Sequence, residues 1–342
     1  MKLLYFFYLL KKTRFSTLIR QIKHLKKIKK WSYFKVLSKV LGAFLQYNTA
    51  FLDYFSFKFY EKSEAQKAAF IDPIFLYKFQ KALNKREDRK YFKNKDLFLE
   101  KFKAYIDHDH FLPFENDLTS FTSWLKQRTP ASLILKSSTG YQGVGIEKVQ
   151  VLQKGNIYFF NSMNIESFYV FLKKNRLDLI EVAIEQHPIL NHMYSGSLNT
   201  IRIITVVDSQ KKVHFLGAML RVGTTGFVDN FSAGGVSAQI DLKTGIVIAP
   251  LVSKDSRLIH ESGKHPITHK DIIGVALPFW VELKEMVGQA ALVVPSVRTV
   301  GWDVAITSKG PYLLEGNDNW NQVIWQRTSD EGYKKELEEF LN

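Results

Sequence analysis

The chain has 342 residues, of which 46% are hydrophobic and 24% charged, so it is long enough for two or three domains and cannot be globally disordered. It contains no cysteine, which excludes a disulfide scaffold, a thiolate nucleophile and every metal site built on Cys. The formal net charge is +15. No apolar stretch approaches the roughly 20 residues that a membrane-spanning helix needs.

The positive charge is concentrated at the N-terminus. Residues 1–52 contain twelve Lys or Arg and no Asp or Glu. An apolar run, LLYFFYLL at 3–10, precedes a helix-spaced apolar stripe at 15, 18, 19, 22, 25 and 28 with basic residues opposite. No small-residue cleavage site follows the apolar run, so a signal peptide is disfavoured. The pattern predicts a basic amphipathic segment that lies on an anionic membrane surface.

Two other interpretations of this segment stay open. An ordinary amphipathic helix that packs on the protein body would have the same spacing. Nucleic acid is the less favoured partner, because a basic stretch also binds phosphates but no nucleic-acid module follows it.

Four segments are predicted along the chain. The basic membrane-surface segment spans 1–52, and a mostly helical region with breaks near Asp72-Pro73 and Leu112-Pro113 spans 53–130. Alternating residues then predict strands at 131–136, 146–152 and 156–160, a helix at 167–177 and a strand at 179–186. These elements form a third segment, 131–188. The fourth, 189–342, contains a hairpin around Ser209-Gln210, strands at 236–241 and 246–249, a helix at 278–290 and a hairpin at 299–316.

A glycine-rich loop, KSSTGYQGVG at 136–145, follows the first predicted strand. Glycines allow backbone N–H groups to approach phosphate oxygens closely. A Walker A loop or a dinucleotide fingerprint would open a helix, whereas this loop is followed by a strand-like segment. The kinase motifs HRD and DFG are absent. A hairpin loop without a ligand remains an alternative for the loop taken alone.

Acidic residues meet in the last hairpin, VGWDVAIT and YLLEGN. With Lys309 at the turn centre, Asp303 and Glu315 lie opposite each other, and Asn317 shares the face of Glu315. Facing carboxylates repel unless a cation neutralises them, and Mg²⁺ prefers such hard oxygen ligands. The hairpin therefore predicts a magnesium site.

A strand lysine, a glycine loop and an Asp…Glu-x-Asn hairpin in this order resemble the ATP-grasp superfamily. Five segments are similar, more narrowly, to sugar-transfer-associated ATP-grasp proteins: LNTIRIITV (198–206), AMLRVG (218–223), VDNFSAGGVSAQIDLKTG (228–245), HPIT (265–268) and GWDVAITSKGPYLLEGN (301–317). The resemblance implies an α+β ATP-grasp fold, with two subdomains that grip ATP, after a helical N-terminal region.

The resemblance also implies roles for single residues. Lys95 and Lys136 would bind ATP phosphates, Gly140, Gly143 and Gly145 would cover them, and Glu185 and Gln186 would read adenine. Asp303, Glu315 and Asn317 would hold Mg²⁺, with two ions expected, while Arg202 and Arg221 would stabilise the transferring phosphoryl group. Asn199, Asn230 and His265 are candidate substrate contacts. Many ligases of the superfamily have an arginine where this chain has Gly301.

The function that the resemblance implies is an ATP-dependent carboxylate–amine ligase of cell-envelope polysaccharide (capsule) biosynthesis. It would form an amide through an acyl-phosphate, with a sugar or uronic acid and an amino acid or amine as substrates. The expected location is cytoplasmic, at the inner face of the membrane, near a lipid-linked or nucleotide-linked glycan. A kinase acting on a sugar hydroxyl and a membrane-associated assembly protein with a vestigial ATP site are the alternatives.

Overall fold

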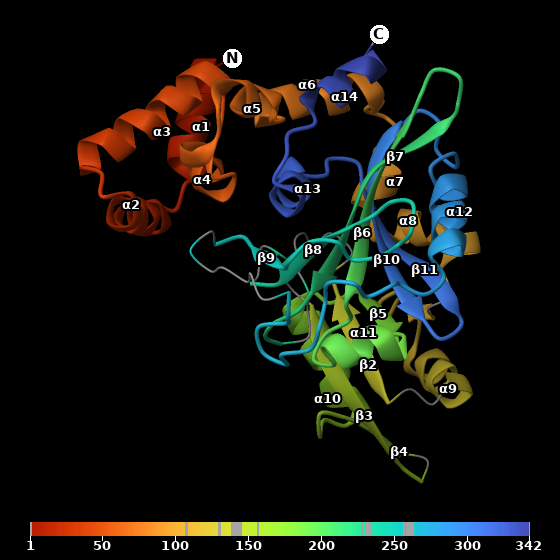
Figure 1. Cartoon of the computed structure of the whole chain (residues 1–342). Helices are drawn as coiled ribbons and strands as arrows, with labels where there is room; N and C mark the ends of the chain where they lie inside the picture. The colour runs from red at the N-terminus through yellow and green to blue at the C-terminus, as the bar shows by residue number, and fades with distance from the viewer. Residues whose placement is uncertain are drawn as a thin grey trace.

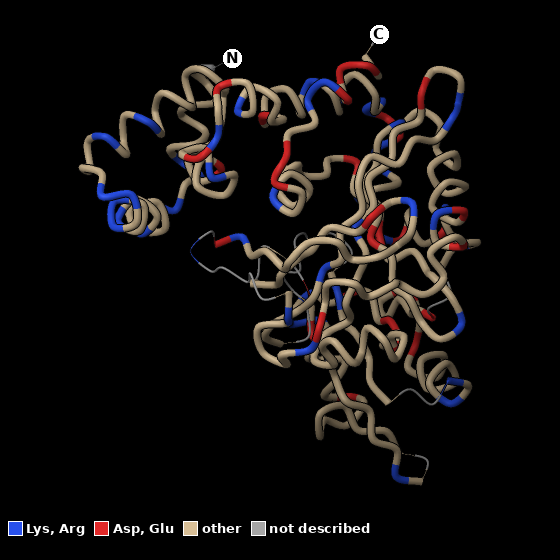
Figure 2. Tube along the Cα trace, viewed as in Figure 1, with Lys and Arg blue, Asp and Glu red and all other residues tan. Residues whose placement is uncertain are grey.

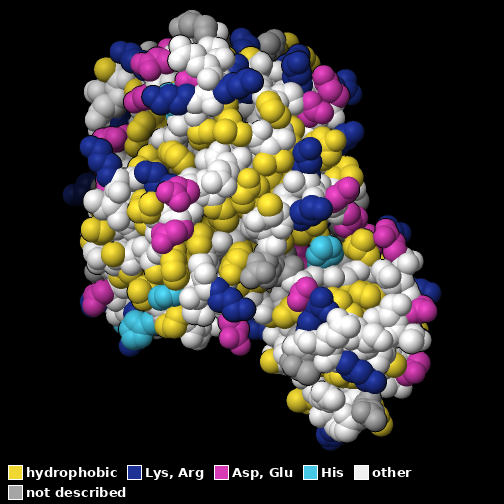
Figure 3. All heavy atoms as spheres, turned by 90° about the vertical axis from the view of Figure 1, so that its right-hand side faces the viewer, with side chains coloured by type: hydrophobic (Ala, Val, Ile, Leu, Met, Phe, Trp, Pro, Cys, Tyr) yellow, Lys and Arg dark blue, Asp and Glu magenta, His cyan; other side chains and the backbone are white. Residues whose placement is uncertain are grey.

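The computed structural model describes residues 2–106, 109–128, 131–137, 146–155, 157–226, 229, 231, 234–255, 257 and 263–341. A helical N-terminal part joins a large body, from which a smaller lobe projects (Figures 1 and 3). The body and the lobe are each built on one antiparallel sheet. This α+β architecture agrees with the predicted fold class.

The first part of the chain is mostly helical, as predicted for residues up to 130, and an exception is a short strand at His110–Phe111. Its helices are α1 (Lys2–Lys12), α2 (Phe15–Lys29), α3 (Tyr33–Tyr47), α4 (Phe51–Ser56), α5 (Glu64–Ala69), α6 (Pro73–Leu83), α7 (Lys90–Lys93), α8 (Lys95–Lys101) and α9 (Leu118–Arg128), with 3-10 turns at Phe59–Glu61 and Lys103–Tyr105. The predicted break at Asp72-Pro73 is a helix start. Asp72 accepts hydrogen bonds from the amides of Ile74 and Phe75, both at 3.0 Å, and thereby caps α6.

An aromatic core holds the N-terminal helices together. Phe44, Phe55, Phe59 and Phe70 are buried in it, and Phe57 and Phe70 lie with ring centroids 4.8 Å apart. The core thus joins residues on both sides of position 52.

Helix α2 has the predicted basic amphipathic sequence, but much of its apolar stripe faces the protein. Leu18, Ile22 and Leu25 are buried in the aromatic core. Phe15 and Ile19 remain 50% exposed. Packing on the body, one of the two alternatives, therefore accounts for half of the stripe.

The smaller lobe is a five-stranded sheet covered by α9 and α10 (Ile165–Asn175). Its strand order is β1-β5-β2-β3-β4. The strands are β1 (His110–Phe111), β2 (Ser132–Lys136), β3 (Glu147–Lys154), β4 (Ile157–Phe160) and β5 (Leu179–Val182). Phe121, Phe160 and Phe168 are fully buried and stack in its core.

The strand predicted at 179–186 is too long, because it ends at Val182. The amide of Ala183 still donates to Ser132 O in the small sheet, whereas the amide of His187 donates to Ile306 O in the large one. The chain crosses from one sheet to the other between these two residues and cannot continue the strand.

The large sheet has the order β11-β10-β6-β7-β8-β9. Its strands are β6 (Thr200–Val207), β7 (Val213–Val222), β8 (Val236–Ile240), β9 (Val252–Ser253), β10 (Thr299–Thr307) and β11 (Gly310–Asn317). The strand predicted at 246–249 is wrong. Ile246 and Val247 make only isolated bridges, to Ala276 and Ile240.

Helices cover both faces of the large sheet. One face packs on α12 (Trp280–Ala290) and α8, and the other on α6 and α13 (Gln322–Ser329). Gly217 allows α13 to approach closely, since a Cβ there would lie 2.5 Å from Trp325 Nε1. The remaining helices are α11 (Pro188–Met193) and α14 (Lys334–Glu338), with a 3-10 turn at Glu339–Leu341.

Candidate active site

The acidic hairpin has the register that the sequence predicts, for a partly different reason. Asp303 pairs with Glu315, and Gly301 pairs with Asn317. The turn, however, is the two-residue type between Thr307 and Gly310 rather than one centred on Lys309. A bulge at Leu314 adds one residue to β11 and restores the pairing of the two acidic residues.

Two arginines bind Asp303 from neighbouring strands. Arg202 on β6 contacts both carboxylate oxygens, through Nε and, at 2.8 Å, through Nη2. Arg221 on β7 donates to Oδ2 at 2.7 Å, and its other Nη donates to Asp229 at 3.0 Å. Strand alternation places Arg202, Arg221 and Asp303 on one face of the sheet.

This cluster is buried, and its charges compensate one another. Burial alone would raise the pKa of Asp303, but Arg202 and Arg221 outweigh that effect and hold its pKa below the ordinary value. Asp229 is held further by the Thr200 amide, which donates to it at 3.0 Å, and by the Thr200 hydroxyl. Burial raises the pKa of Asp229 even though Arg221 opposes the shift.

Glu315 and Asn317 are more accessible than Asp303. The surrounding protein raises the pKa of Glu315 by desolvation, and the Asp303 charge adds to the shift, although part of the Glu315 side chain is open to solvent. Asn317 Nδ2 donates to Glu315 Oε1 at 3.1 Å. The amide oxygen of Asn317 is therefore not the atom bound to Glu315.

The donor set fits a hard cation that completes its coordination with phosphate oxygens and water. It offers the carboxylates of Glu315 and Asp303 and one amide oxygen. Within the described part of the chain, no group of three or more His, Cys, Asp or Glu could hold a metal ion by itself. Both Asp303 oxygens also accept from arginines.

The two predicted lysines lie close to each other on the small-lobe side. Lys136, the last residue of β2, forms an ion pair with Glu181 on β5. Lys95, the first residue of α8, donates through Nζ to Ser137 O. Burial lowers the pKa of Lys95, and the Lys136 charge adds to the shift, while Glu315 and Glu181 oppose it. The charges of β2, β5 and β11 therefore all act on Lys95 at the start of α8.

The predicted adenine contacts occupy the crossover between the two sheets. Glu185 is exposed. The Gln186 side chain, in contrast, holds the loop after α11: its amide nitrogen donates to Tyr194 O at 3.0 Å and Ser197 O at 2.9 Å, and its oxygen accepts from Asn199 N at 2.9 Å.

The candidate substrate residues that the structure describes are buried. Asn199 has no exposed surface and bonds to Gln186, Leu190 O and Tyr194 O. His265 is also fully buried, with Nε2 2.7 Å from Gly223 O and its ring stacked on Tyr194. Asn230 and the loop glycines Gly140, Gly143 and Gly145 lie outside the described residues.

Comparison with known families identifies the fold around this cluster. The model of the family described as sugar-transfer associated ATP-grasp matches residues 75–342. The chain belongs to the sugar-transfer-associated ATP-grasp family. The matched range contains every site residue named above and leaves α1 to α5 outside it. No curated protein sequence matches the chain.

Several solved ATP-grasp structures are similar at low identity. The D-alanine–D-alanine ligase from Coxiella burnetii is 10% identical, with a TM-score of 0.41, over 74% of this chain and 57% of that one. The ATP-grasp ligase PsnB, complexed with a minimal precursor, is 12% identical (TM-score 0.42; 78% and 66%). The D-alanyl-alanine synthetase A from Vibrio cholerae O1 biovar eltor is 12% identical (TM-score 0.43; 75% and 66%).

In this ATP-grasp chain, Gly301 leaves room for Trp320. A Cβ at position 301 would lie 2.8 Å from Trp320 Cβ and 3.4 Å from Arg202 Cδ. Arg298 lies at the end of the strand, where Nε donates to Val207 O at 2.7 Å. The guanidinium groups beside the acidic pair come from β6 and β7, through Arg202 and Arg221, rather than from β10.

Sequence reasoning missed Glu181 and Asp229. Glu181 is a buried carboxylate in the otherwise apolar strand LIEV, and this pattern was a usable signal, because a buried charge needs a partner. Asp229 lies in an irregular segment with no periodicity, and only the fold brings it to Arg221.

Proposed function

We propose that this ATP-grasp protein is a carboxylate–amine ligase. The observation that supports this proposal best is the convergence of the Asp303–Glu315 pair, two arginines and two lysines at one place. Transfer of the ATP γ-phosphoryl group to a carboxylate would give an acyl-phosphate and ADP. Attack by an amine on the acyl carbon would then form the amide and release phosphate.

Each group has a task in this reaction. Lys136 and Lys95 bind phosphate oxygens, and the three N–H donors of the Lys136 ammonium group leave donors for phosphate beside the ion pair with Glu181. Asp303 orients Arg202 and Arg221, and a guanidinium has five N–H donors, so donors remain for the transferring phosphoryl group. Mg²⁺, when bound by Glu315, Asp303 and Asn317, supplies positive charge that neutralises the phosphates.

The substrates are proposed from the family, whose description associates it with sugar transfer. We propose a sugar or uronic acid joined to an amino acid or amine during cell-envelope polysaccharide biosynthesis. The test is ADP release assayed against a panel of uronic acids and amino acids, with mass spectrometry of the product. Joining of two substrates with loss of water supports the ligase. If a single substrate gains one phosphate, the protein is a kinase. If no substrate increases ADP release, the result supports an assembly protein with a vestigial ATP site.

We also propose that the protein works at the cytoplasmic face of an anionic membrane. None of the described helices is long and apolar enough to cross a bilayer. Helix α1 is nonetheless apolar on both sides: Leu9 is buried in the aromatic core, while Leu4 and Phe7 are 76% and 59% exposed. A helix that is apolar all round is normally covered on all sides.

The positive charge around α1 supports an anionic lipid surface as the partner that covers its exposed apolar residues. Lys11 and Lys12 end the helix, and Figure 2 shows Lys and Arg along α2 and α3, with acidic residues appearing only from α4 onward. Each basic residue near an anionic leaflet contributes about 1 kcal/mol of attraction. The surface that contacts lipid is thus the outer side of α1 rather than the buried stripe of α2.

Vesicle flotation tests this attachment. Leu4→Asp/Phe7→Asp should detach the full chain from vesicles of equal phosphatidylglycerol and phosphatidylcholine, and salt should weaken wild-type binding. Val281→Asp on α12 is the matched control, because Val281 is 65% exposed and lies outside the helical N-terminal part of the chain. Equal flotation of wild type and the α1 variant at low salt would rule out this surface.

A further inference from the structure

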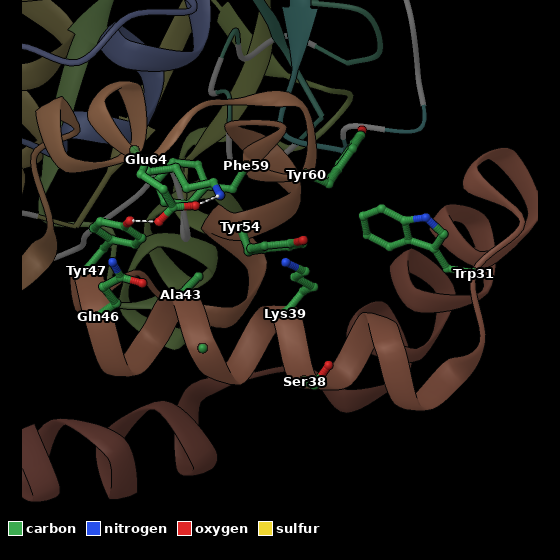
Figure 4. Close-up of a pocket in the computed structure, with 12 residues that line it drawn as sticks. Trp31, Ser38, Lys39, Ala43, Gln46, Tyr47, Tyr54, Phe59, Tyr60 and Glu64 are labelled. Atoms are coloured by element: carbon green, nitrogen blue, oxygen red, sulfur yellow. Dashed lines mark hydrogen bonds and ion pairs between the residues drawn. The ribbon is translucent and has the colours of Figure 1, made fainter.

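A pocket of about 320 Å³ lies in the helical N-terminal part, outside the residues that the family model matches (Figure 4). This volume is within the range of small-molecule sites. Its walls come from α3, α4, α5, the segments that join them and Trp31, which lies between α2 and α3. The side chains that line it include Trp31, Lys39, Gln46, Tyr54, Tyr60 and Glu64.

The charged residues that line the pocket are two lysines, Lys39 and Lys67, and one carboxylate, Glu64, so their net charge is positive, and Lys39 is exposed to solvent. Glu64, its one lining carboxylate, is occupied on both oxygens: Lys67 donates to Oε1 at 2.7 Å, and the Tyr47 hydroxyl donates to Oε2. Lys39 has no ion pair or hydrogen bond with any residue that the structure describes. Figure 4 shows the Lys39 ammonium group beside the Tyr54 ring, with Trp31 further away. An anion is therefore the favoured ligand at Lys39.

Aromatic rings and polar side-chain groups line the same pocket as this ammonium group. Lys35 lies over the Trp31 ring at 4.7 Å and adds positive charge, whereas Lys29, over the Tyr60 ring at 5.4 Å, is neutralised by Glu61 at 2.7 Å. Large rings provide apolar surface for the C–H groups of a sugar or polyol, and the amide of Gln46 can bond to hydroxyl groups.

We propose that this pocket binds a phosphate ester of a sugar or polyol, with the phosphate on Lys39 and the carbon skeleton against the aromatic rings. The ester can be a soluble metabolite or the headgroup of an anionic lipid. The pocket is open at Gly42, where an added Cβ meets no atom within 4 Å, which leaves access for either source. The proposal does not depend on the ligase reaction.

A larger side chain at Gly42 would close the pocket. It lies within α3 and lines the pocket, and a Cβ built on it meets no atom within 4 Å. A side chain there fills the opening without disturbing the packing of α3, and replacement of a helical glycine favours the helix. Gly42→Leu should therefore block the ligand in a folded protein, whereas Gly42→Ala, the matched control, should bind it almost normally.

The experiment is calorimetric titration of the full chain with glucose 1-phosphate and with uncharged glucose, together with flotation on phosphatidylglycerol vesicles. We expect glucose 1-phosphate to bind, glucose to bind far more weakly, and affinity to fall about tenfold or more in Lys39→Met and in Gly42→Leu. Lys27→Met on α2, which does not line the pocket, should bind as wild type does.

Vesicle binding that falls in Gly42→Leu, without binding of the soluble ester, would assign the phosphate to a lipid headgroup. Ester binding that is lost in Lys136→Ala but kept in Lys39→Met would place it in the ATP site and overturn the proposal. So would the absence of both kinds of binding, or binding that Gly42→Leu leaves unchanged.

Discussion

Replacing Glu315 with glutamine should reduce substrate-dependent ADP release at least about 100-fold. The substitution keeps the shape of the side chain and its contact with Asn317 but removes the negative charge that faces Asp303. Loss of groups that merely orient metal ligands already costs 10–100-fold, so loss of a ligand should cost at least as much. Steady-state ADP release at saturating ATP and Mg²⁺ is the measurement.

The fold of the Glu315→Gln protein should be intact. One of two facing carboxylates becomes neutral, so the melting temperature should stay the same or rise. Glu285→Gln on the outer helix α12 is the matched control and should keep wild-type activity. Full turnover in Glu315→Gln would show that the acidic hairpin does not hold the metal.

Replacing Arg221 with methionine should destabilise the protein by about 3–5 kcal/mol. Its guanidinium bridges Asp303 and Asp229, and all three side chains are at least nine-tenths buried. Removal of one partner from a buried ionic cluster leaves charge without compensation, which is far more costly than loss of a surface ion pair. Urea denaturation of the two proteins gives the difference in unfolding free energy.

A second substitution separates charge from packing in this result. Arg221→Met/Asp229→Asn should recover part of the lost stability, since Asp229, the carboxylate that is left without an arginine, is then neutral, while Asp303 keeps Arg202. Arg298→Met removes a guanidinium whose one hydrogen bond to the described residues is with Val207 O, and should cost only about 1 kcal/mol. Equal losses for Arg221→Met and Arg298→Met would contradict the buried cluster.

Much of the site was predictable because strands have a strict period of two. Counting from a turn centred on Lys309 placed Asp303 opposite Glu315, but the pairing arises from a turn at Thr307–Gly310 together with a bulge at Leu314 that the count did not contain. The lysine at the end of the first strand was also visible in the sequence, and the structure places it beside Lys95. The local pattern therefore predicted which residues of each strand belong to the site. Their convergence at one place was predicted from the resemblance to the ATP-grasp superfamily.

The partners of these residues were less predictable. The sequence assigned the arginines to substrate phosphate and Asp303 to metal, and it gave no sign that these groups bind one another. That contact depends on the order β10-β6-β7 in the sheet, which no local pattern encodes. The same holds for α2, because spacing predicts an apolar stripe but not which body covers it.

The bulge at Leu314 has a consequence for how chain length can vary in this hairpin. Between the turn and the bulge, Val304 pairs with Leu313; beyond it, Asp303 pairs with Glu315 and Gly301 with Asn317. A chain that lacked only Leu314 would keep all three pairings in a regular ladder, with Glu315 still on the face of Asp303. Position 314 is thus a place where one residue can be gained or lost between proteins that share the same carboxylate pair.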